Sequence, residues 1–506
     1  MMIKLSPIRL LIARPAAIGR TVRPTRYVPM SNGPSRFYTT AYEEASEDPA
    51  AAADATATVV ADQRDIKNLM HSATWLDALT ERERQLKDGK TLDSYSYVNP
   101  KTTAVTEKTR SESFSYLILP FKDDQWLCDS YINAFGRLRA GQLFQDLDAL
   151  AGRIAYKHCA PAEPVNVTAS VDRILMLKKV DEIQNYNFVL AGSVTWTGRS
   201  SMEISVKGYA FTESIPEKIV ELELPSENVF LAANFTFVAR NPLTHKSFAI
   251  NTLLPVNEQE WLDYRRAESF NAKKKLAAKN KSIIEPTDEE NRLVHDMWKA
   301  SKTVQPSVNS SVQFMKDTTF TSTLFMQPQY RNRHSYMIFG GYLLRNAFEL
   351  AYLTAAAFTS AGPRFVSLDS TTFKAPVPVG SVLSMTASVC YTEHLGEDTG
   401  FESPFNLPPT NKLSSKPDSF LLEAGTLVQV KVDTTIKALD SPESKESGCF
   451  IYSFFVPHSS YSDAEEHCSL VIPQTYSEMM SYLEGRRRAL DTANYVKSIL
   501  GSGKGL

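Results

Sequence analysis

The sequence predicts an α+β fold with an internal duplication. Two long segments share one plan, in which a single apolar helix is accompanied by many strand-like runs. The helices are predicted over residues 136–155 and 340–358. A charged, helix-prone segment at 257–316 separates the two copies and is predicted to be a linker. A chain of 506 residues is long enough for two or three domains with substantial cores.

The first copy is predicted to span 110–256. A strand-like run at 113–120 precedes its helix, in which apolar residues recur at the i, i+3, i+4, i+7 spacing of a buried stripe. The strand-like runs that follow are "VNVTASVDRILML", "NFVLAGSVTWTGRSSMEISVKGYAF" and "VFLAANFTFVAR". The middle run breaks at "TGRSS", which predicts a hairpin turn.

One carboxylate on the first helix does not fit an ordinary amphipathic pattern. Asp148 falls on or beside the apolar stripe, whereas Asp146 falls on the polar side with Gln142 and Arg153. Because desolvating a charge is costly, a carboxylate turned toward a buried face needs a reason.

The second copy is predicted to span 317–475, and a C-terminal helix and tail to span 476–506. "TFTSTLFMQP" precedes its helix, and four strand-like runs follow: "RFVSLDSTTF", "SVLSMTASVCYTE", "SFLLEAGTLVQVKV" and "CFIYSFFVP". A loop at 394–419, rich in Pro, Ser and charge, predicts a flexible insertion. The "KKK" run at 273–275 of the linker is expected on a solvated face.

Composition and motifs exclude several classes of function. The net charge of −2 argues against a general nucleic-acid binder, and no run of about 18 apolar residues could span a membrane. The five cysteines form no CxxC pair and the eight histidines do not cluster at metal-ligand spacing. GxSxG, HExxH and dinucleotide-binding glycine motifs are absent. Any chemistry must therefore come from the helix carboxylate and the loops that precede the helices.

The N-terminus has the composition of a mitochondrial presequence. The first carboxylate is Glu43, and before it stand seven basic residues. These are Lys4, Arg9, Arg14, Arg20, Arg23, Arg26 and Arg36. We predict a presequence at 1–38, a spacer with N-terminal helices at 39–109, and import into the mitochondrial matrix. A disordered basic tail is the alternative.

The start of the second helix offers a catalytic geometry. In "FGGYLL", glycines would let a substrate carbonyl approach the free N–H groups and positive dipole end of a helix. A carboxylate two turns along a similar helix could activate water or attack directly. Together these groups would suffice for acyl transfer to water. A buried Asp that only hydrogen-bonds the neighbouring backbone is the alternative.

Several segments resemble one family in its order along the chain. They include "GQLFQDLDALAGRIAYKH", "VTWTGRSSMEISV", "FTFVARNP", "QPQYRNRHSYMIFGGYLLRNAFELAY", "FKAPVPVGSVL" and "PQTYSEMMSYLEGRR". The chain resembles the mitochondrial double-hotdog acyl-CoA thioesterases, the acyl-coenzyme A thioesterase 9 branch with its fungal relatives. The resemblance implies two tandem hotdog domains, each a long helix wrapped by an antiparallel β-sheet. It also implies hydrolysis of fatty acyl-CoA to fatty acid and CoA, without metal or organic cofactor.

The resemblance also implies site residues. The family carboxylate lies eight residues after the first position of the glycine pair, which is Asp148 in the first copy and Phe348 in the second. Asp148 would therefore face the cleft between the two hotdogs, with the Gly340 N–H on the thioester oxygen. Glu349 follows Phe348, and we expect it to form a surface ion pair with Arg345. One of the two clefts is therefore expected to be inactive.

Two further positions carry over from the family. The carbonyl-binding amide lies seven residues before the first glycine, which is Asn133 in the first copy and Arg333 in the second. A loop one residue longer would make Asn332 the donor, with His334 as the competitor. Ser170 corresponds to a family serine that could orient water, although an ordinary strand hydroxyl is the alternative.

Other functions on the same fold remain open from the sequence. Hydratase or dehydratase chemistry would need a catalytic histidine, for which only His334 is placed. A non-catalytic acyl-CoA-binding or structural protein of mitochondria is a further alternative, because a fold does not determine a function. The expected partners are the acyl-CoA substrate and CoA, with no nucleic acid and no membrane span. We also expect a homo-oligomer, because hotdog domains usually assemble further.

Overall fold

The fold was analysed in a computed structural model of the chain. The structure describes residues 100–242, 244–279, 285–304, 312–332, 337–395, 424–460 and 469–502. The predicted presequence and most of the 39–109 spacer lie outside these residues, as does nearly all of the insertion predicted at 394–419.

Ten strands of the described residues form one antiparallel sheet in the order β2-β4-β5-β6-β3-β10-β13-β12-β11-β9. The strands of the first half are β2 (Ser115–Leu119), β3 (Val165–Met176), β4 (Asn187–Thr197), β5 (Ser201–Phe211) and β6 (Val229–Arg240). Those of the second half are β9 (Phe320–Phe325), β10 (Arg364–Phe373), β11 (Val382–Leu395), β12 (Gly425–Lys437) and β13 (Ser444–Pro457).

The strand order shows the internal duplication directly. In each half the first strand in sequence lies at the outer edge and the second lies at the centre of the sheet. The halves are joined where β3 pairs with β10, for example at Val171 and Thr371. The fold is therefore α+β with two tandem hotdog domains, and these domains share one continuous sheet.

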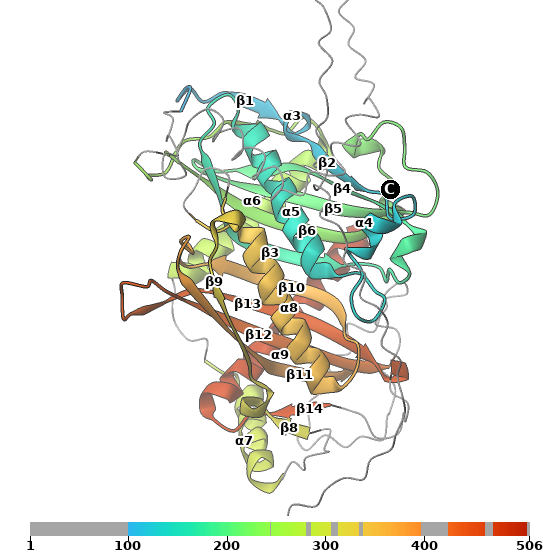
Figure 1. The fold of residues 1–506 in the computed structure, drawn as a ribbon, viewed down its shortest axis with the longest axis vertical. Coiled ribbons are helices and arrows are strands. Elements are labelled where there is room, and N and C mark those ends of the chain that lie inside the picture. The colour runs from blue at the N-terminus through green and yellow to red at the C-terminus, as the bar shows by residue number, and fades with distance from the viewer. Residues whose placement is uncertain are drawn as a thin grey trace, which may run out of the picture. The chain divides into compact units, whose positions relative to one another are not determined.

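A long helix crosses one face of the sheet in each half. These helices are α5 (Ala140–Cys159) and α8 (Gly340–Thr359), which lie side by side in front of the strands (Figure 1). The second was predicted over nearly the same residues. The first begins at Ala140 rather than at Gly136, because Gly136 has a φ of +72° and a bridge joins Ile132 to Leu138. The preceding residues therefore form a turned loop and not the first helical turn.

Strand alternation separates an apolar inner face from an outer face covered by other helices. On β5, Met202 and Ile204 belong to the core beneath α5, whereas Glu203 between them points outward and accepts a hydrogen bond from Asn271. Asn271 belongs to α6 (Glu258–Lys279). In the second half the outer face is covered by α9 (Tyr476–Ser502), from which Thr492 donates to Asp369 on β10 at 2.8 Å.

The charged linker packs more closely than its composition suggested. Lys274 of α6 forms an ion pair with Asp172, which is only 2% exposed on β3. The expectation that the 273–275 run lies on a solvated face is therefore wrong for Lys274. The buried carboxylate needs a positive partner, and the helix supplies it.

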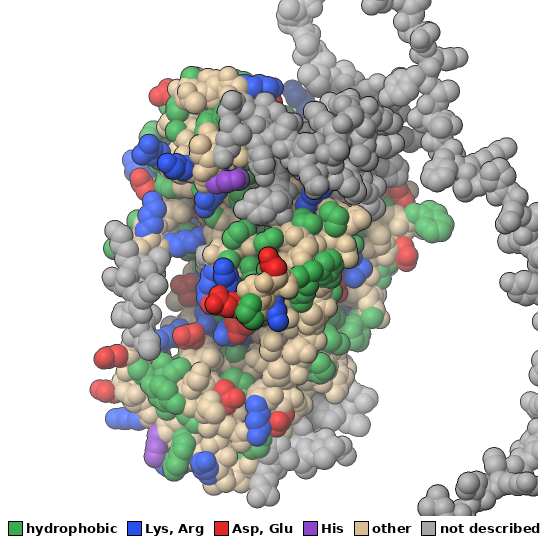
Figure 2. Space-filling view, turned by 60° about the vertical axis from the view of Figure 1, so that its left-hand side comes forward, with side chains coloured by type: hydrophobic (Ala, Val, Ile, Leu, Met, Phe, Trp, Pro, Cys, Tyr) green, Lys and Arg blue, Asp and Glu red, His purple; other side chains and the backbone are tan. Residues whose placement is uncertain are grey.

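Short elements complete the described part of the chain. The pairs are β1 (Glu107–Thr109) with β7 (Thr252–Leu254), and β8 (Val312–Phe314) with β14 (Leu470–Ile472). The short helices are α3 (Arg110–Ser113) and α4 (Gln125–Asp129), whereas α7 (Asp288–Thr303) is a helix of 16 residues in the linker. On the face shown in Figure 2, Lys and Arg side chains lie among Asp and Glu side chains. No helix among the described residues is long and apolar enough to cross a membrane.

Candidate active site

Two glycines bring α5 and α8 into close antiparallel contact. A β carbon added to Gly341 would lie 2.9 Å from the carbonyl oxygen of Gln145. One added to Gly141 would lie 3.0 Å from Cδ1 of Phe348. The start of each helix thus packs against the middle of the other. As a result, the residue eight positions along one helix approaches the N-terminus of its partner.

Asp148 of α5 lies against the first residue of α8. Its side chain is fully buried, and the Thr168 hydroxyl donates a hydrogen bond to Oδ1 at 2.9 Å. A β carbon on Gly340 would lie 3.1 Å from Asp148 Oδ2 and 3.2 Å from Thr168 Oγ1. The structure therefore brings a carboxylate of the first domain to the helix start of the second, where only a glycine leaves it this much room.

The pKa of Asp148 is shifted into the neutral range. Burial raises it to about 7, because an ionised carboxylate loses its water. The Thr168 hydrogen bond and the Gly341 N–H oppose this rise by favouring the ionised form. Oδ2 makes no hydrogen bond of good geometry with any residue the structure describes. The carboxylate is thus held at one oxygen, while the other is directed toward the start of α8.

The first turn of α8 contains backbone N–H groups that can act as hydrogen-bond donors. Its N-cap residue, Phe339, provides no side-chain hydrogen bond to the first turn. The first N–H groups of a helix lack partners within the helix, and they carry its positive dipole end. Gly340 and Gly341 occupy this turn; the Gly341 N–H faces the Asp148 carboxylate, and the Gly340 N–H is the donor considered for a carbonyl oxygen.

The loops that precede the two helices are built alike, which aligns their residues. In the first copy, Asn133 N–H donates to the Arg137 carbonyl at 2.8 Å, within the bridge of Ile132 and Leu138. In the second, Asn332 N–H donates to the Met337 carbonyl at 2.8 Å, within the bridge of Arg331 and Ile338.

Asn332 is therefore the structural counterpart of Asn133, and the second loop has one more residue after it. Arg333 and His334 belong to residues 333–336, which lie outside the described residues. The backbone alignment thus favours Asn332 over Arg333 as the counterpart of the family amide.

Ser170 lies away from this site. Its hydroxyl donates to Asp172 Oδ1 at 2.8 Å and accepts a hydrogen bond from Lys274 on the outer face of the sheet. Ser170 was expected either to orient water or to be an ordinary strand hydroxyl, and its contacts with Asp172 and Lys274 are those of a strand hydroxyl on the outer face. A break in the pairing of β3 with β6 separates Thr168 from Ser170 and turns the two hydroxyls to opposite faces.

Thr168 is the site residue that the sequence did not reveal. It stands two positions before Ser170, so strict alternation would place both on one face. The strand-like run contained the hydroxyl, but nothing in "NVTASVD" indicates where the bulge falls. Pairing with a strand some 70 residues away decides its position.

The second cleft lacks a carboxylate at the equivalent position. Phe348 occupies that position, is 3% exposed, and packs edge-on against Phe144 with ring centroids 5.0 Å apart. Its ring lies beside Gly141 at the start of α5. An aromatic ring can neither accept a proton from water nor attack a thioester.

Glu349 does not pair with Arg345 as expected. It accepts a hydrogen bond from Arg139 Nε at 2.7 Å, across the domain boundary. Arg345 instead donates to Gln145 Oε1 at 3.3 Å. The antiparallel crossing of α5 and α8 determines both partners. Glu349 and Arg345 of α8 each meet a residue at or near the start of α5, rather than each other one turn apart on α8.

Asp146 is also buried, contrary to the polar side assigned to it. It is 5% exposed and accepts a hydrogen bond from the Tyr131 hydroxyl. Burial raises its pKa to about 7 as well. The helix is covered on this side by the loop that precedes it, so periodicity along the helix misjudges the exposure.

No group of three or more His, Cys, Asp and Glu side chains within the described ranges could hold a metal ion. The described part of the candidate site brings together the Asp148 carboxylate, the Thr168 hydroxyl and the glycine start of α8.

Comparisons with known proteins identify the family. No family model matches the chain. Two acyl-coenzyme A thioesterases of hop (Humulus lupulus), mitochondrial 4 and chloroplastic 2, are 33% and 34% identical over 302 residues. These matches cover 58% of this chain and 55% and 67% of the relatives. The mitochondrial acyl-coenzyme A thioesterase 9 of mouse is 28% identical over 82% of this chain and 84% of its own length.

Among solved structures, an acyl-CoA hydrolase from Staphylococcus aureus matches 35% of this chain and 94% of its own, with 22% identity and a TM-score of 0.27. The sequence relatives include one that is 34% identical and covered over two thirds of its length. The chain belongs to the acyl-CoA thioesterase family.

Proposed function

We propose that the protein hydrolyses acyl-CoA thioesters to a fatty acid and CoA, at the cleft where Asp148 meets the start of α8. The observation that carries the proposal is the buried Asp148 carboxylate beside Gly340, with one oxygen held by Thr168. A base and a helix N-terminus on opposite domains can hold a water and a carbonyl between them. Membership of the thioesterase family supports the same reaction.

The proposed reaction uses Asp148 as a general base. Ionised Asp148 takes a proton from water while the water oxygen attacks the thioester carbon. The carbonyl oxygen becomes an oxyanion, and the Gly340 N–H donates to it. When the tetrahedral intermediate collapses, the carbon–sulfur bond breaks. The CoA thiolate then receives the proton from Asp148, which restores the ionised carboxylate.

Direct attack by Asp148 is the alternative use of the same residue. It would form a mixed anhydride with release of CoA, and water would then cleave the anhydride. Label in the Asp148 carboxylate after a single turnover in ¹⁸O-labelled water would identify the anhydride route, because it requires water to cleave at the Asp148 carbonyl; cleavage at the acyl carbonyl places the label in the fatty acid instead. General-base catalysis leaves the protein unlabelled.

We assign a second donor to the carbonyl oxygen, the side-chain amide of Asn332. Its backbone position matches that of Asn133 in the other loop, and an amide donates without titrating near neutral pH. His334 remains the competing donor. The two differ in pH dependence, since a histidine donor would change charge near its ordinary pKa of about 6.5.

Thiol release from acyl-CoA of varied chain length tests the function. The purified protein should release CoA thiol from at least one chain length, and Asp148→Asn should remove most of this activity. Binding of acyl-CoA without thiol release at any chain length would instead indicate a non-catalytic binding protein. Hydration of an enoyl-CoA without thiol release would indicate hydratase chemistry.

We further propose that the protein acts in the mitochondrial matrix after residues 1 to about 38 are removed. The basic, acid-free N-terminus supports import, and relatives carry mitochondrial names. N-terminal sequencing of protein purified from mitochondria tests cleavage. Retention of Met1 on that protein would contradict it.

A further inference from the structure

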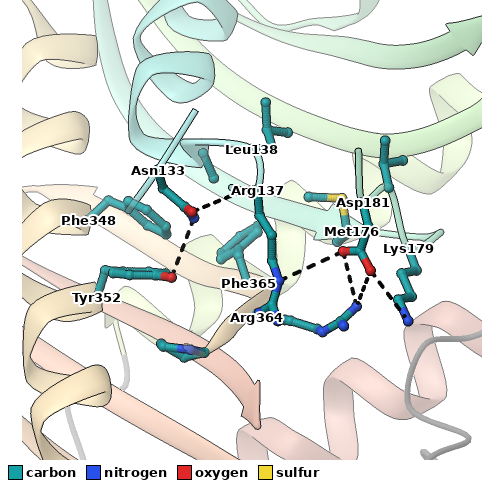
Figure 3. Close-up of a pocket in the computed structure, with 13 residues that line it drawn as sticks. Asn133, Arg137, Leu138, Met176, Lys179, Asp181, Phe348, Tyr352, Arg364 and Phe365 are labelled. Atoms are coloured by element: carbon teal, nitrogen blue, oxygen red, sulfur yellow. Dashed lines mark hydrogen bonds and ion pairs between the residues drawn. The ribbon is translucent and has the colours of Figure 1, made fainter. Parts of the chain in front are cut away.

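The second cleft, where Phe348 takes the place of the carboxylate, contains a pocket. Residues of both domains line it, and Phe348 and Tyr352 lie on one side of it while Asp181 and Lys179 lie on the other (Figure 3). Phe348 is 3% exposed, and Phe365, which also lines the pocket, is 6% exposed. The pocket therefore has an aromatic side that adjoins the core and a separate polar side.

The polar side is bridged by contacts between the two domains. Arg364 of β10 donates to Asp181 Oδ2 at 3.0 Å, and Arg137 donates to the Gly362 carbonyl at 2.9 Å. A saturated acyl chain can take part in no such hydrogen bond, and it gains free energy by leaving water. Within this pocket an acyl chain would therefore lie on the aromatic side.

Phe144 connects the aromatic side to the helix face that carries Asp148. Its ring is fully buried and packs edge-on against Phe348 and Phe365, with centroid distances of 5.0 and 4.9 Å. Phe144 precedes Asp148 by four residues on α5, so the two side chains lie on the same face of that helix. A chain that passed from Asp148 toward the pocket would therefore meet these rings.

The geometry of α8 gives the distance from the proposed reaction centre to Phe348. Gly340 lies at Asp148, and Phe348 follows it by eight residues, which corresponds to about 12 Å along the helix at about 1.5 Å per residue. An extended chain advances about 1.2 Å per bond, so about ten bonds cover this distance. Leu344 and Ala347 are fully buried between the two ends, so the path along α8 is apolar.

We propose that Phe144 and Phe348 determine specificity by limiting the length of the acyl chain that is hydrolysed at Asp148. A chain of up to about ten carbons ends against their rings, whereas a longer chain must displace the rings to enter the pocket beyond. This inference rests on the proposed function and names its substrate class, acyl-CoA with short and medium acyl chains. The phenylalanine that replaces the second carboxylate thus acts on the substrate of the remaining cleft.

Thiol release from saturated acyl-CoAs, from butanoyl to hexadecanoyl, tests the proposal on the full chain. Wild type should hydrolyse octanoyl-CoA with a higher kcat/KM than hexadecanoyl-CoA. Phe348→Leu and Phe144→Leu should each raise the ratio of hexadecanoyl-CoA to octanoyl-CoA hydrolysis by at least about tenfold. A single methylene in an apolar pocket can already change kcat/KM by about that factor.

Filling the pocket tests where the longer chain goes. Val180 lines the pocket and is partly buried. Val180→Phe alone should leave the wild-type ratio unchanged, because the chains that wild type hydrolyses end before the pocket. Combined with Phe348→Leu it should cancel the gain for hexadecanoyl-CoA, because the added ring takes the space that the longer chain would enter.

Control variants separate chain length from folding. Phe188→Leu makes the same truncation at a ring that is 1% exposed and packs against Phe121 and Phe230 within the first domain, and it should leave the ratio unchanged. Phe348→Met is a milder change, since methionine is flexible but of similar volume. Thermal unfolding establishes that each variant is folded. Binding of the same acyl-CoAs to proteins that also carry Asp148→Asn gives a measurement that does not depend on hydrolysis.

Each outcome decides the proposal. A gain for hexadecanoyl-CoA in a folded Phe144 or Phe348 variant that Val180→Phe cancels supports it. An unchanged ratio in all folded variants of these two residues would overturn it, as would a gain that persists with Val180→Phe or that also occurs in Phe188→Leu. If no protein releases thiol but the binding preference shifts toward longer chains, the proposed hydrolysis fails and the limit on chain length stands. Absence of both effects would overturn both proposals.

Discussion

Asp148 and Gly340 come from different domains, yet a β carbon on Gly340 would stand 3.1 Å from Asp148 Oδ2. Such a spacing is tighter than nine in ten real β-carbon contacts, so any larger residue at position 340 would require the carboxylate to shift. The antiparallel crossing of α5 and α8 produces this approach, and the same crossing places Phe348 beside Gly141 in the other cleft. The duplication thus sets a helix start beside the middle of the partner helix twice, and among the described residues only Asp148 stands there as a carboxylate, with Phe348 at the equivalent position.

Asp148→Asn should lower kcat by roughly 10²- to 10⁴-fold, the usual contribution of a positioned general base. KM should change little, because the side chain keeps its size and its contact with Thr168. The measurement is steady-state thiol release. Asp146→Asn is the matched control, since Asp146 is also buried with a pKa of about 7 but is held by Tyr131. Equal losses in both variants would contradict a specific role for Asp148.

The pH dependence of kcat/KM should report the ionisation of Asp148. Burial raises its pKa to about 7, and only the ionised form can accept a proton from water. The rate should therefore rise with pH through about 7 and level off above it. A rate that is independent of pH between about 5 and 9 would argue against Asp148 as the base.

The raised pKa of Asp148 should make the folded protein less stable as the pH rises, whereas the rate of catalysis should increase. The folded protein retains a proton on Asp148 that the unfolded chain releases near pH 3.8, so this group contributes stability below pH 4. That contribution is lost as pH rises to about 7, at about 1.4 kcal/mol per pKa unit. Asp148→Asn should therefore be more stable than wild type at pH 8 in denaturant unfolding, with a smaller difference at pH 5.

Thr168→Val should shift the acid limb of the rate profile to higher pH. The Thr168 hydroxyl donates to the ionised carboxylate, and hydrogen bonds to charged groups contribute about 1.5–3 kcal/mol. Losing one corresponds to a pKa increase of about 1–2 units. Thr168→Ser keeps the hydroxyl and should return the profile close to that of wild type. A profile that is unchanged in the Val variant would show that the bond does not tune the base.

The local pattern of the sequence was sufficient to predict the two helices and the duplication, and it placed Asp148 on or beside the buried stripe of the first helix. Apolar spacing along α5 and α8 and the strand-like runs depend on neighbours within a few residues. The joining of β3 to β10 could not be predicted, because it depends on pairing between residues about 200 positions apart, such as Val171 and Thr371. A continuous sheet was therefore not expected.

The partners of individual side chains were predicted less well, for the same reason. Thr168 and Ser170 separate at a bulge whose place depends on β6. Glu349 pairs with Arg139 and Asp146 with Tyr131, and both partners lie on loops or helices brought in by the tertiary fold. The periodicity of the sequence indicates on which face of its own helix a residue lies. Which side chains it contacts depends on how the second helix packs against that face.

Glu349→Gln should leave turnover within a few-fold of wild type. Glu349 lies one residue after the family carboxylate position. It forms an ion pair with Arg139, and each of the two side chains is more than one third exposed. Exposed pairs of this kind contribute about 0–1 kcal/mol, so unfolding should also change little. The comparison is thiol release by this variant and by Asp148→Asn. Loss of activity in the Glu349 variant alone would assign catalysis to the other cleft.

Gly340→Ala should lower kcat/KM by roughly 10- to 100-fold, because small displacements of reacting groups are costly. The added methyl group would lie 3.1 Å from Asp148 Oδ2 and 3.2 Å from Thr168 Oγ1, so the carboxylate must move by a few tenths of an ångström. The methyl group would also stand where the thioester oxygen is proposed to approach the helix start. Steady-state kinetics on folded protein measures the effect.

Gly152→Ala on α5 is the control for a methyl group added to a helix. Its nearest neighbour would be Phe237 Cε1 at 3.9 Å, an ordinary contact. Alanine within a helix is favoured over glycine by about 0.5–1 kcal/mol, so this variant should be slightly more stable and fully active. Full activity in Gly340→Ala would show that the methyl group is accommodated, and the substrate carbonyl would then have to bind away from the first turn of α8.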